Sequence, residues 1–277
     1  MILTQTDGGL HLAGVRDFCL TDILTCGQCF RWNEISPGTF YGVAGGMELT
    51  IAQREDTLRL KGCTIKQYEE FWRDYFDLNR DYGSIKVTLR GDETMRRAIG
   101  FTPGMRVLRQ EPWEALCSFI LSQNNNLARI RGIVARLCEA FGEPLPGGGQ
   151  AFPSPQAISG LTVNDLAPLR AGFRAKYVLD AARKVSSGAV SLDEVARMEY
   201  DKAQETLRQI HGVGVKVADC ALLYGFHKVE AFPLDVWMKR VMERFYPGGL
   251  PDCILTYPGI AQQYLFHYIR CGCEVSA

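Results

Sequence analysis

The sequence predicts an α+β fold, in which an N-terminal antiparallel β-sheet domain is followed by an all-α domain. Residues 1–62 contain short, partly alternating apolar segments that are separated by turn signals, as in a β meander. From about residue 82 onward, the apolar residues recur at helical spacing. We therefore predict a β-rich domain at residues 1–98 and a helical domain at residues 99–277.

The β-rich domain is expected to contain a meander, because turn signals at 36–38, 45–46 and 54–56 divide its apolar segments. An amphipathic helix with aromatic anchors follows at Gln67–Asp77. The predicted strands are Cys29–Glu34, Thr39–Gly45, Met47–Gln53 and Thr57–Lys61.

The rest of the chain is expected to be helical, with a Pro- and Gly-rich loop at Pro144–Pro155. The helix at Trp113–Gln123 is apolar nearly all round, which indicates a buried central helix. The predicted helices are Asp92–Ile99, Trp113–Gln123, Leu127–Phe141, Val163–Leu169, Arg174–Val185, Asp201–Ile210, Val215–Tyr224, Asp235–Tyr246 and Tyr257–Tyr268.

Composition limits the classes of function. The 31 basic residues of the chain balance its 31 acidic residues, so a globally basic nucleic-acid binder is disfavoured. A local basic surface remains, because residues 115–137 hold three arginines and no acid.

No apolar run reaches the roughly 18 residues of a membrane span, and no signal peptide is recognised. We expect no membrane association, a cytoplasmic location and free thiols for most of the ten cysteines.

The segment 201–224 predicts two helices joined by the glycine-rich turn His211-Gly212-Val213-Gly214. Such a turn and the unpaired N–H groups of the following helix can bind a phosphate. The same pattern also fits an ordinary helical hairpin with glycine caps.

Lys216 lies in the first turn of the second hairpin helix, where the helix dipole disfavours a cation. Such a lysine is either solvated or held as the neutral amine, and a neutral amine is a candidate nucleophile. Asp235 lies at the predicted start of a later helix and is a natural N-cap. If the two side chains meet, the amine could attack an electrophilic sugar carbon and the carboxylate could stabilise positive charge on that sugar.

The hairpin with Lys216 and Asp235 resembles the helix-hairpin-helix superfamily of DNA glycosylases, in the branch with a Gly-rich hairpin, Pro and Asp. Further segments resemble its 8-oxoguanine DNA glycosylase/AP lyase family. These segments are Gly27–Trp32, Leu108–Pro112, Ser118–Ile120, Asn124–Ile130, Gly172–Tyr177, Gly212–Cys220 and Pro233–Val236, with Gln262 and Phe266.

The resemblance implies a bifunctional repair enzyme that acts on double-stranded DNA. The damaged base would leave the helical stack. Lys216 would attack C1′ and form a Schiff base, and β-elimination would then nick the strand. Asp235 would stabilise the oxocarbenium-like charge.

The resemblance also implies roles for residues that contact the flipped base. The main-chain carbonyl of Gly27 would accept the N7–H that 8-oxoguanine has and guanine lacks. Gln262 would read the Watson–Crick edge, and the base would lie between Phe266 and Cys220. For Cys220, the residues alone equally fit packing in the core. For Gln262 and Phe266, the residues alone favour an ordinary polar residue of the last helix and a core residue, respectively.

Two further groups of contacts follow from the resemblance. Asn124, Arg129, Arg174 and Phe173 would face the cytosine opposite the lesion, and arginine side chains suit the two acceptors of an orphaned cytosine. Phosphate would be bound by Gly212, Gly214, Val215 and Trp237.

Two positions depart from the eukaryotic pattern of the family. Phe173 replaces a tyrosine, and Trp237 replaces a histidine that could carry charge. We therefore expect the selectivity for cytosine and the phosphate contacts to differ from those of the eukaryotic enzymes. The absence of a basic tail after Phe266 favours a prokaryotic source.

The resemblance implies no required cofactor or metal, and it allows a monovalent cation at the hairpin. Cys253, Cys271 and Cys273 lack the number and spacing of an iron–sulfur cluster. We expect a monomer.

Two alternatives remain. A monofunctional alkylated-base glycosylase would share Asp235 but lack Lys216. A non-catalytic DNA-binding module would need neither residue.

Overall fold

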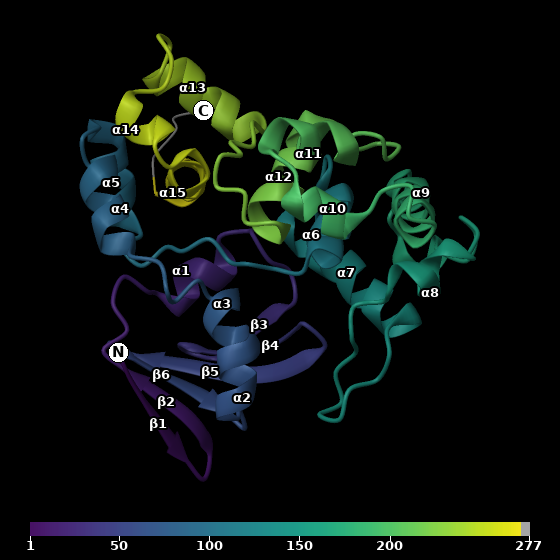
Figure 1. Ribbon diagram of the computed structural model, residues 1–277, viewed down its shortest axis with the longest axis horizontal. Coiled ribbons are helices and arrows are strands. Elements are labelled where there is room, and N and C mark those ends of the chain that lie inside the picture. The colour runs from purple at the N-terminus through teal and green to yellow at the C-terminus, as the bar shows by residue number, and fades with distance from the viewer. Residues whose placement is uncertain (273–277) are drawn as a thin grey trace.

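The computed structural model describes residues 1–272 and has the predicted order of a β-sheet followed by helices. In Figure 1 the sheet lies at one end of the molecule, and most of the helices form a second body above it. Residues 273–277, which include Cys273, lie outside the described residues.

A six-stranded antiparallel sheet has the strand order β1-β2-β6-β5-β4-β3. The four-stranded meander predicted from the turn signals is confirmed as β3 to β6. The prediction lacked the N-terminal hairpin of β1 and β2, which extends the sheet because β2 pairs with β6. The strands are β1 (Ile2–Thr6), β2 (Gly9–Ala13), β3 (Trp32–Ser36), β4 (Thr39–Ala44), β5 (Met47–Arg54) and β6 (Thr57–Lys61).

An aromatic helical segment packs on the sheet and confirms the helix predicted at residues 67–77. It consists of α2 (Ile65–Gln67), a π-helical turn η1 (Tyr68–Trp72) and α3 (Arg73–Tyr75). The indole N–H of Trp32, on β3, donates a hydrogen bond of 2.8 Å to the hydroxyl of Tyr75. The ring of Trp32 also lies 6.0 Å from that of Trp72. Burial of these large rings is the main stabilisation of the sheet core.

The second body is helical. Its central helix is α6, which is buried along almost its whole length, as the all-round apolar pattern predicted. The helices after α3 are α4 (Tyr82–Leu89), α5 (Glu93–Phe101), α6 (Pro112–Ser122), α7 (Leu127–Phe141), α8 (Pro155–Ser159), α9 (Arg174–Ser186), α10 (Leu192–Arg197), α11 (Tyr200–Leu207), α12 (Val215–Gly225), α13 (Val236–Phe245), α14 (Asp252–Leu255) and α15 (Pro258–Cys271).

One predicted helix is wrong. The segment 163–169 contains only a short 3-10 turn, η2 (Ala167–Leu169). The carboxylate of Asp165 accepts hydrogen bonds from the backbone N–H and the hydroxyl of Thr162, which fixes a turn in place of a helix start. Arg170 then has a positive φ of 54°, which ends the turn. Helices α1 (Leu20–Thr25), α4, α8, α10 and α14 were not predicted as separate elements.

The buried side chains form two cores. The smaller core lies between the sheet and the aromatic segment, and the larger core lies among the helices. Buried residues of α4 and α5 belong to the larger core, so packing divides the chain near residue 80. The domain boundary between residues 98 and 99 stays a prediction.

The Pro- and Gly-rich loop after α7 reaches back to the sheet, as Figure 1 shows. The carboxylate of Glu48, on β5, accepts hydrogen bonds from the backbone N–H groups of Gly147 and Gly149. The same carboxylate accepts a hydrogen bond from the hydroxyl of Tyr41. These contacts attach the helical body to the sheet at a second place.

Candidate active site

A pocket of about 350 Å³ is lined by residues from the start of the chain, from the hairpin and from the last helix. It brings together seven of the residues that the sequence singled out. These are Gly27, Lys216, Cys220, Asp235, Trp237, Gln262 and Phe266.

Lys216 lies in the first turn of α12 and faces this pocket. Its Nζ atom lies 3.5 Å from the hydroxyl of Ser122 and 5.7 Å from the centroid of the Phe119 ring. Both contacts come from α6, the buried central helix. The amine is therefore positioned by a rigid element, and a weak hydroxyl contact leaves it available to a ligand.

Cys220 follows Lys216 by one helical turn, and both side chains line the pocket. Burial raises the pKa of its thiol to about 11, although the positive charge of Lys216 acts in the opposite direction. The thiol is therefore neutral at pH 7. A neutral thiol presents an apolar, polarisable surface to the pocket and does not compete with Lys216 as a nucleophile.

Asp235 is the N-cap of α13, as the sequence predicted. Its Oδ1 atom accepts a hydrogen bond of 2.8 Å from the backbone N–H of Met238. One carboxylate oxygen thus fixes the side chain on the start of a helix, and the residue also lines the pocket. A fixed carboxylate can stabilise positive charge that develops on a bound sugar.

Gly27 lies at a bend with a φ of 97°, which favours glycine. The neighbouring Gln28 is fully buried and fixes this bend from behind. Its amide donates to the backbone oxygens of Ile23 and Arg106, at 3.0 and 2.8 Å, and accepts from the N–H of Leu108 at 2.8 Å. The backbone of Gly27 is therefore held rigidly at the pocket wall.

Helix α15 contributes one face to the pocket. Gln262 is buried, and its amide donates to the carbonyl oxygen of Pro233 at 3.3 Å. Its side-chain oxygen lies 3.5 Å from the hydroxyl of Tyr224. Phe266 lies one helical turn further along the same face and also lines the pocket.

The two glycines of the glycine-rich turn differ in their surroundings, because Gly212 is closely packed and Gly214 is open. Gly212 has a φ of 82°, and a Cβ atom there would stand 2.4 Å from the ring of Tyr177. Gly214 has an ordinary φ of −91°, and a Cβ atom at this position would have no neighbour within 4 Å. The prediction that both glycines serve a tight turn therefore holds only for Gly212. Val215, the first residue of α12, is 48% exposed beside this open side.

A second hollow of about 490 Å³ adjoins the pocket. The two share Ser122, Asn125, Lys216, Asp235 and Trp237. The residues that line the second hollow but not the first include Asn124, Gly214 and Lys239. Their amide, backbone and ammonium groups suit an extended polar ligand.

The residues predicted to face the opposite strand lie outside the smaller pocket. Asn124 is exposed and has a positive φ of 47°. Phe173 is 49% exposed, and Arg129 is exposed in the first turn of α7. Arg174 is only 3% exposed and donates from Nε and Nη2 to the backbone oxygens of Gln123 and Asn124, at 2.6 and 2.7 Å. In this structure Arg174 therefore holds the Asn124 turn in place.

Several pocket residues were missed as site residues by the sequence reasoning. The most informative is Arg270, which lies on the same face of α15 as Gln262 and Phe266 at a spacing of four residues. That spacing is visible in the sequence and could have identified it. Other lining residues, among them Phe30, Phe119 and Tyr224, have the residue types of an ordinary apolar core and so do not stand out in the sequence.

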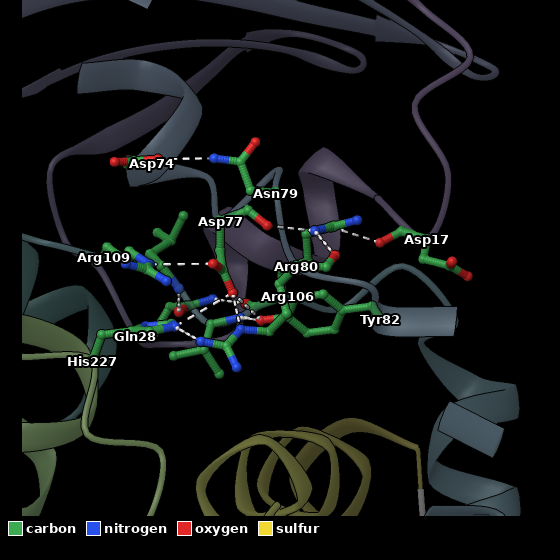
Figure 2. Close-up of polar contacts among 12 residues, drawn as sticks. Asp17, Gln28, Asp74, Asp77, Asn79, Arg80, Tyr82, Arg106, Arg109 and His227 are labelled. Atoms are coloured by element: carbon green, nitrogen blue, oxygen red, sulfur yellow. Dashed lines mark hydrogen bonds and ion pairs between the residues drawn. The ribbon is translucent and has the colours of Figure 1, made fainter. Parts of the chain in front are cut away.

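A buried polar network lies away from the pocket, where the sheet side of the molecule meets α12 (Figure 2). Asp77, which is 2% exposed, forms ion pairs with Arg80 at 2.7 Å and with Arg109 at 3.2 Å. His227, just after α12, lies 3.4 Å from the same carboxylate. Burial alone would raise the pKa of Asp77, but the hydrogen bond with His227 and the surrounding positive charges lower it to about 2.

The same network holds the chain that links the two cores. Arg106 is buried and donates from Nη1 to the backbone oxygen of Asp77 at 2.6 Å. It also donates from Nε and Nη2 to the oxygens of Asp17 and Arg16, both at 2.9 Å. Figure 2 shows Gln28 next to this cluster, so the bend at Gly27 is tied to it.

Within residues 1–272, no group of three or more His, Cys, Asp or Glu side chains could hold a metal ion. The nine cysteines of this range have free thiols. Among the helices described, none is both long and apolar enough to span a membrane.

The chain is similar to known repair proteins over most of its length. Residues 12–116 match the N-terminal domain of 8-oxoguanine DNA glycosylase, and residues 117–249 match the HhH-GPD superfamily of base excision DNA repair proteins. The predicted helix-hairpin-helix resemblance is thus confirmed.

Individual relatives agree with this match. The chain is 30% identical to the N-glycosylase/DNA lyase of Saccharomyces cerevisiae, over 83% of this chain and 69% of the yeast protein. It is 32% identical to a probable N-glycosylase/DNA lyase of Methanothermobacter thermautotrophicus, over 62% of each protein. The 8-oxoguanine glycosylase/lyase of Clostridium acetobutylicum, solved with double-stranded DNA containing cytosine opposite 8-oxoguanine, superposes with a TM-score of 0.91. That comparison covers 98% of both chains at 33% identity.

Proposed function

This chain belongs to the HhH-GPD superfamily of base excision DNA repair proteins, and we propose that it excises 8-oxoguanine opposite cytosine and then nicks the strand. The observation that carries the proposal is the meeting of Lys216, Asp235 and Gly27 in one pocket, although they come from separate elements. The pocket volume of about 350 Å³ is sufficient for one flipped base.

In the proposed reaction, the amine of Lys216 attacks C1′ of the damaged nucleotide. The bond between C1′ and N9 of the base breaks, and the base leaves with the bonding electrons and takes up a proton. Asp235, fixed as a helix cap, stabilises the positive charge that develops on the sugar. The C1′–O4′ bond of the sugar ring then breaks, the ring oxygen takes up a proton from the amine, and a Schiff base forms between Lys216 and C1′. Loss of a proton from C2′ of this Schiff base expels the 3′ phosphate, which leaves with the electrons of the C3′–O bond.

Recognition of the lesion is proposed to depend on the backbone carbonyl of Gly27. 8-Oxoguanine carries a hydrogen on N7, whereas N7 of guanine is an acceptor. A rigidly held carbonyl would accept from the lesion and repel the normal base. The buried side chain of Gln28 supports this assignment, because its hydrogen bonds fix the bend at Gly27.

The other contacts are proposals of the same kind. Phe266 and Cys220 would lie on either face of the base, and Gln262 would contact its Watson–Crick edge. Asn124, Arg129, Arg174 and Phe173 would occupy the opposite-strand side. The open side of Gly214, together with Val215 and Trp237, would receive phosphate, as free N–H groups at a helix start do.

We further propose that the protein acts as a monomer, in the cytoplasm and without a required cofactor. The many buried free thiols fit a reducing compartment. The backbone oxygens of the glycine-rich turn could take a monovalent cation when DNA is bound.

Borohydride trapping tests the proposed function. A duplex with one 8-oxoguanine opposite cytosine is incubated with wild type, with Lys216→Gln and with Lys66→Gln, an exposed lysine outside both hollows, as a control. We expect a covalent protein–DNA band for wild type and for Lys66→Gln, and none for Lys216→Gln. Release of the base without any trapped band would contradict the lysine mechanism and favour the monofunctional alternative.

A further inference from the structure

Arg270 is a charged residue of the pocket that has no role in the proposed reaction. It lies near the end of α15 and lines the pocket together with Gly27 and Phe266. Its guanidinium carbon lies 5.3 Å from the centroid of the Phe266 ring. The side chain therefore lies beside the ring on which the base is proposed to stack.

The guanidinium is held against the loop that carries Gly27. Its Nη2 atom donates a hydrogen bond of 3.3 Å to the backbone oxygen of Thr25. Its Nη1 atom would stand 3.0 Å from a Cβ atom placed on Gly27. A glycine at position 27 is favoured by its positive φ, and the guanidinium of Arg270 lies against its open face.

The remaining donors of Arg270 face no acid of the protein. A guanidinium has five N–H donors, and the contact with Thr25 uses one of them. Among residues 1–272, no carboxylate forms an ion pair with Arg270, whereas Arg31, Arg80 and Arg109 each have one. A donor left at a pocket wall gains free energy when a ligand supplies an acceptor.

Gly27 and the guanidinium of Arg270 lie side by side at the pocket wall. The acceptor proposed above, the carbonyl of Gly27, would therefore have a donor beside it. The edge of 8-oxoguanine that differs from guanine has the complementary order. Its five-membered ring is a cyclic urea, with a hydrogen on N7 beside a carbonyl at C8. Guanine offers an acceptor at N7 and only a C–H at C8.

We propose that Arg270 determines lesion specificity by donating a hydrogen bond to the C8 carbonyl of 8-oxoguanine. The Gly27 carbonyl and Arg270 together read both groups that oxidation creates. The ring of Phe266, which contacts the guanidinium, keeps the donor at the edge of the base. This assignment rests on the proposed function.

The test compares two substrates in single-turnover assays. One is the duplex with 8-oxoguanine opposite cytosine, and the other carries an abasic site opposite cytosine, which needs Lys216 but presents no base. The proteins are wild type, Arg270→Met, Arg270→Lys and the control Arg183→Met. Arg183 also donates to backbone carbonyls, those of Ser159 and Leu161, but it lies outside the pocket and the adjoining hollow.

We expect Arg270→Met to slow excision of 8-oxoguanine by about 10- to 100-fold, as for a lost hydrogen bond from a charged group. Cleavage at the abasic site should stay within about twofold, because a lost base contact does not affect it. Arg270→Lys should be intermediate, because an ammonium keeps the charge and can still donate but lacks the planar fork of the guanidinium. Arg183→Met should equal wild type.

Three other outcomes overturn the assignment. Unchanged excision by Arg270→Met would remove Arg270 from recognition. An equal loss on both substrates, with a lower Tm, would mean that Arg270 is only structural. If wild type cleaves the abasic duplex but leaves 8-oxoguanine in place, the proposed lesion fails, and the assignment fails with it.

A third duplex identifies the carbonyl that is read. 8-Oxoadenine keeps the C8 carbonyl but has an amino group at C6. We expect Arg270→Met to slow its excision by the same factor as that of 8-oxoguanine. Excision of 8-oxoadenine that is insensitive to the substitution would assign Arg270 to the C6 carbonyl and overturn the assignment to C8.

Discussion

The network around Asp77 and the pocket around Lys216 both gather charged groups, but they treat them differently. The Asp77 carboxylate has ion pairs at 2.7 and 3.2 Å and is 2% exposed. Lys216 has one hydroxyl neighbour at 3.5 Å and an aromatic ring at 5.7 Å. The charges of the network are satisfied by the protein, whereas those of the pocket are left for a substrate. The comparison shows that the two sites differ in the contacts that their charged groups make within the protein. The structural cluster pairs its charged groups with one another, whereas the reactive pocket leaves its amine with weak contacts.

The largest effect on folding is expected from Asp77→Ala. Removal of the buried carboxylate takes away the ion-pair partner of Arg80 and Arg109, which are 25% and 43% exposed, and the acceptor for the buried hydroxyl of Tyr82. Because the arginines stay partly solvated, we expect a loss of about 2–4 kcal/mol in the free energy of unfolding. Urea unfolding measures it, and excision at a temperature where the variant stays folded should remain close to that of wild type. A large loss of activity per folded molecule would show that the network also belongs to the active site.

Asp235→Asn should show the opposite pattern, with a small effect on stability and a large effect on activity. Asparagine is as good an N-cap as aspartate, so the Tm should change little. The lost charge should slow base excision by about 10²- to 10³-fold, or roughly 3–4 kcal/mol in the activation free energy. Single-turnover excision and thermal unfolding measure the two effects separately. A drop in Tm together with unchanged excision would show that Asp235 acts only as a helix cap.

The glycine-rich turn holds a smaller version of the same contrast. Gly212→Ala should destabilise the protein by about 1–3 kcal/mol, because its φ of 82° and the Tyr177 ring leave no room for a methyl group. Gly214→Ala should change stability by less than about 0.5 kcal/mol, because its φ is ordinary and its surroundings are open. We expect the second variant to bind duplex DNA more weakly. Equal stability losses in the two variants would contradict this division.

The smallest effect is a dependence of stability on pH, to which each region contributes one histidine. Burial lowers the pKa of His227, in the network, and lowers that of His267, beside Phe266, to about 4 with help from the charge of Arg270. Below the ordinary histidine pKa the unfolded chain takes up protons that the folded chain does not. Stability should therefore fall from pH 7 to pH 5, with a Tm lower by about 2–4 °C.

The substitution His267→Gln assigns this dependence. It removes one of the two groups, so the shift in Tm between pH 7 and pH 5 should become smaller than in wild type. The part that remains belongs to His227. A shift that His267→Gln leaves unchanged would show that His267 takes up its proton at the same pH in the folded and the unfolded chain.

Regular patterns carried most of the sequence-based prediction. Four strands, the central helix α6, the hairpin and the Asp235 cap follow from alternation, from all-round apolarity and from turn and cap residues. The helix predicted at 163–169 failed because the side chain of Asp165 caps a turn that the apolar spacing does not register.

The site was predicted only in part for a related reason. Lys216 and Asp235 stand out because their residue types are unusual for their positions at helix starts. Ser122 and Phe119 lie in an apolar helix and reach the pocket only through packing of α6 on α12. Likewise, nothing in the sequence around Asp77 predicts its pairing with Arg109 and His227, because these partners are distant along the chain.

The buried amide of Gln28 has a consequence for cooperativity. It binds backbone atoms of Ile23 and Leu108, which are distant along the chain and both pack in the sheet core. The cysteines close to it divide between the two cores, because Cys26 packs in the helical core and Cys29 in the sheet core. Neither core can melt without exposing or orphaning these donors and acceptors. The sheet and the helices should therefore unfold in a single calorimetric transition, and the bend at Gly27 should be among the last segments to exchange its amide hydrogens.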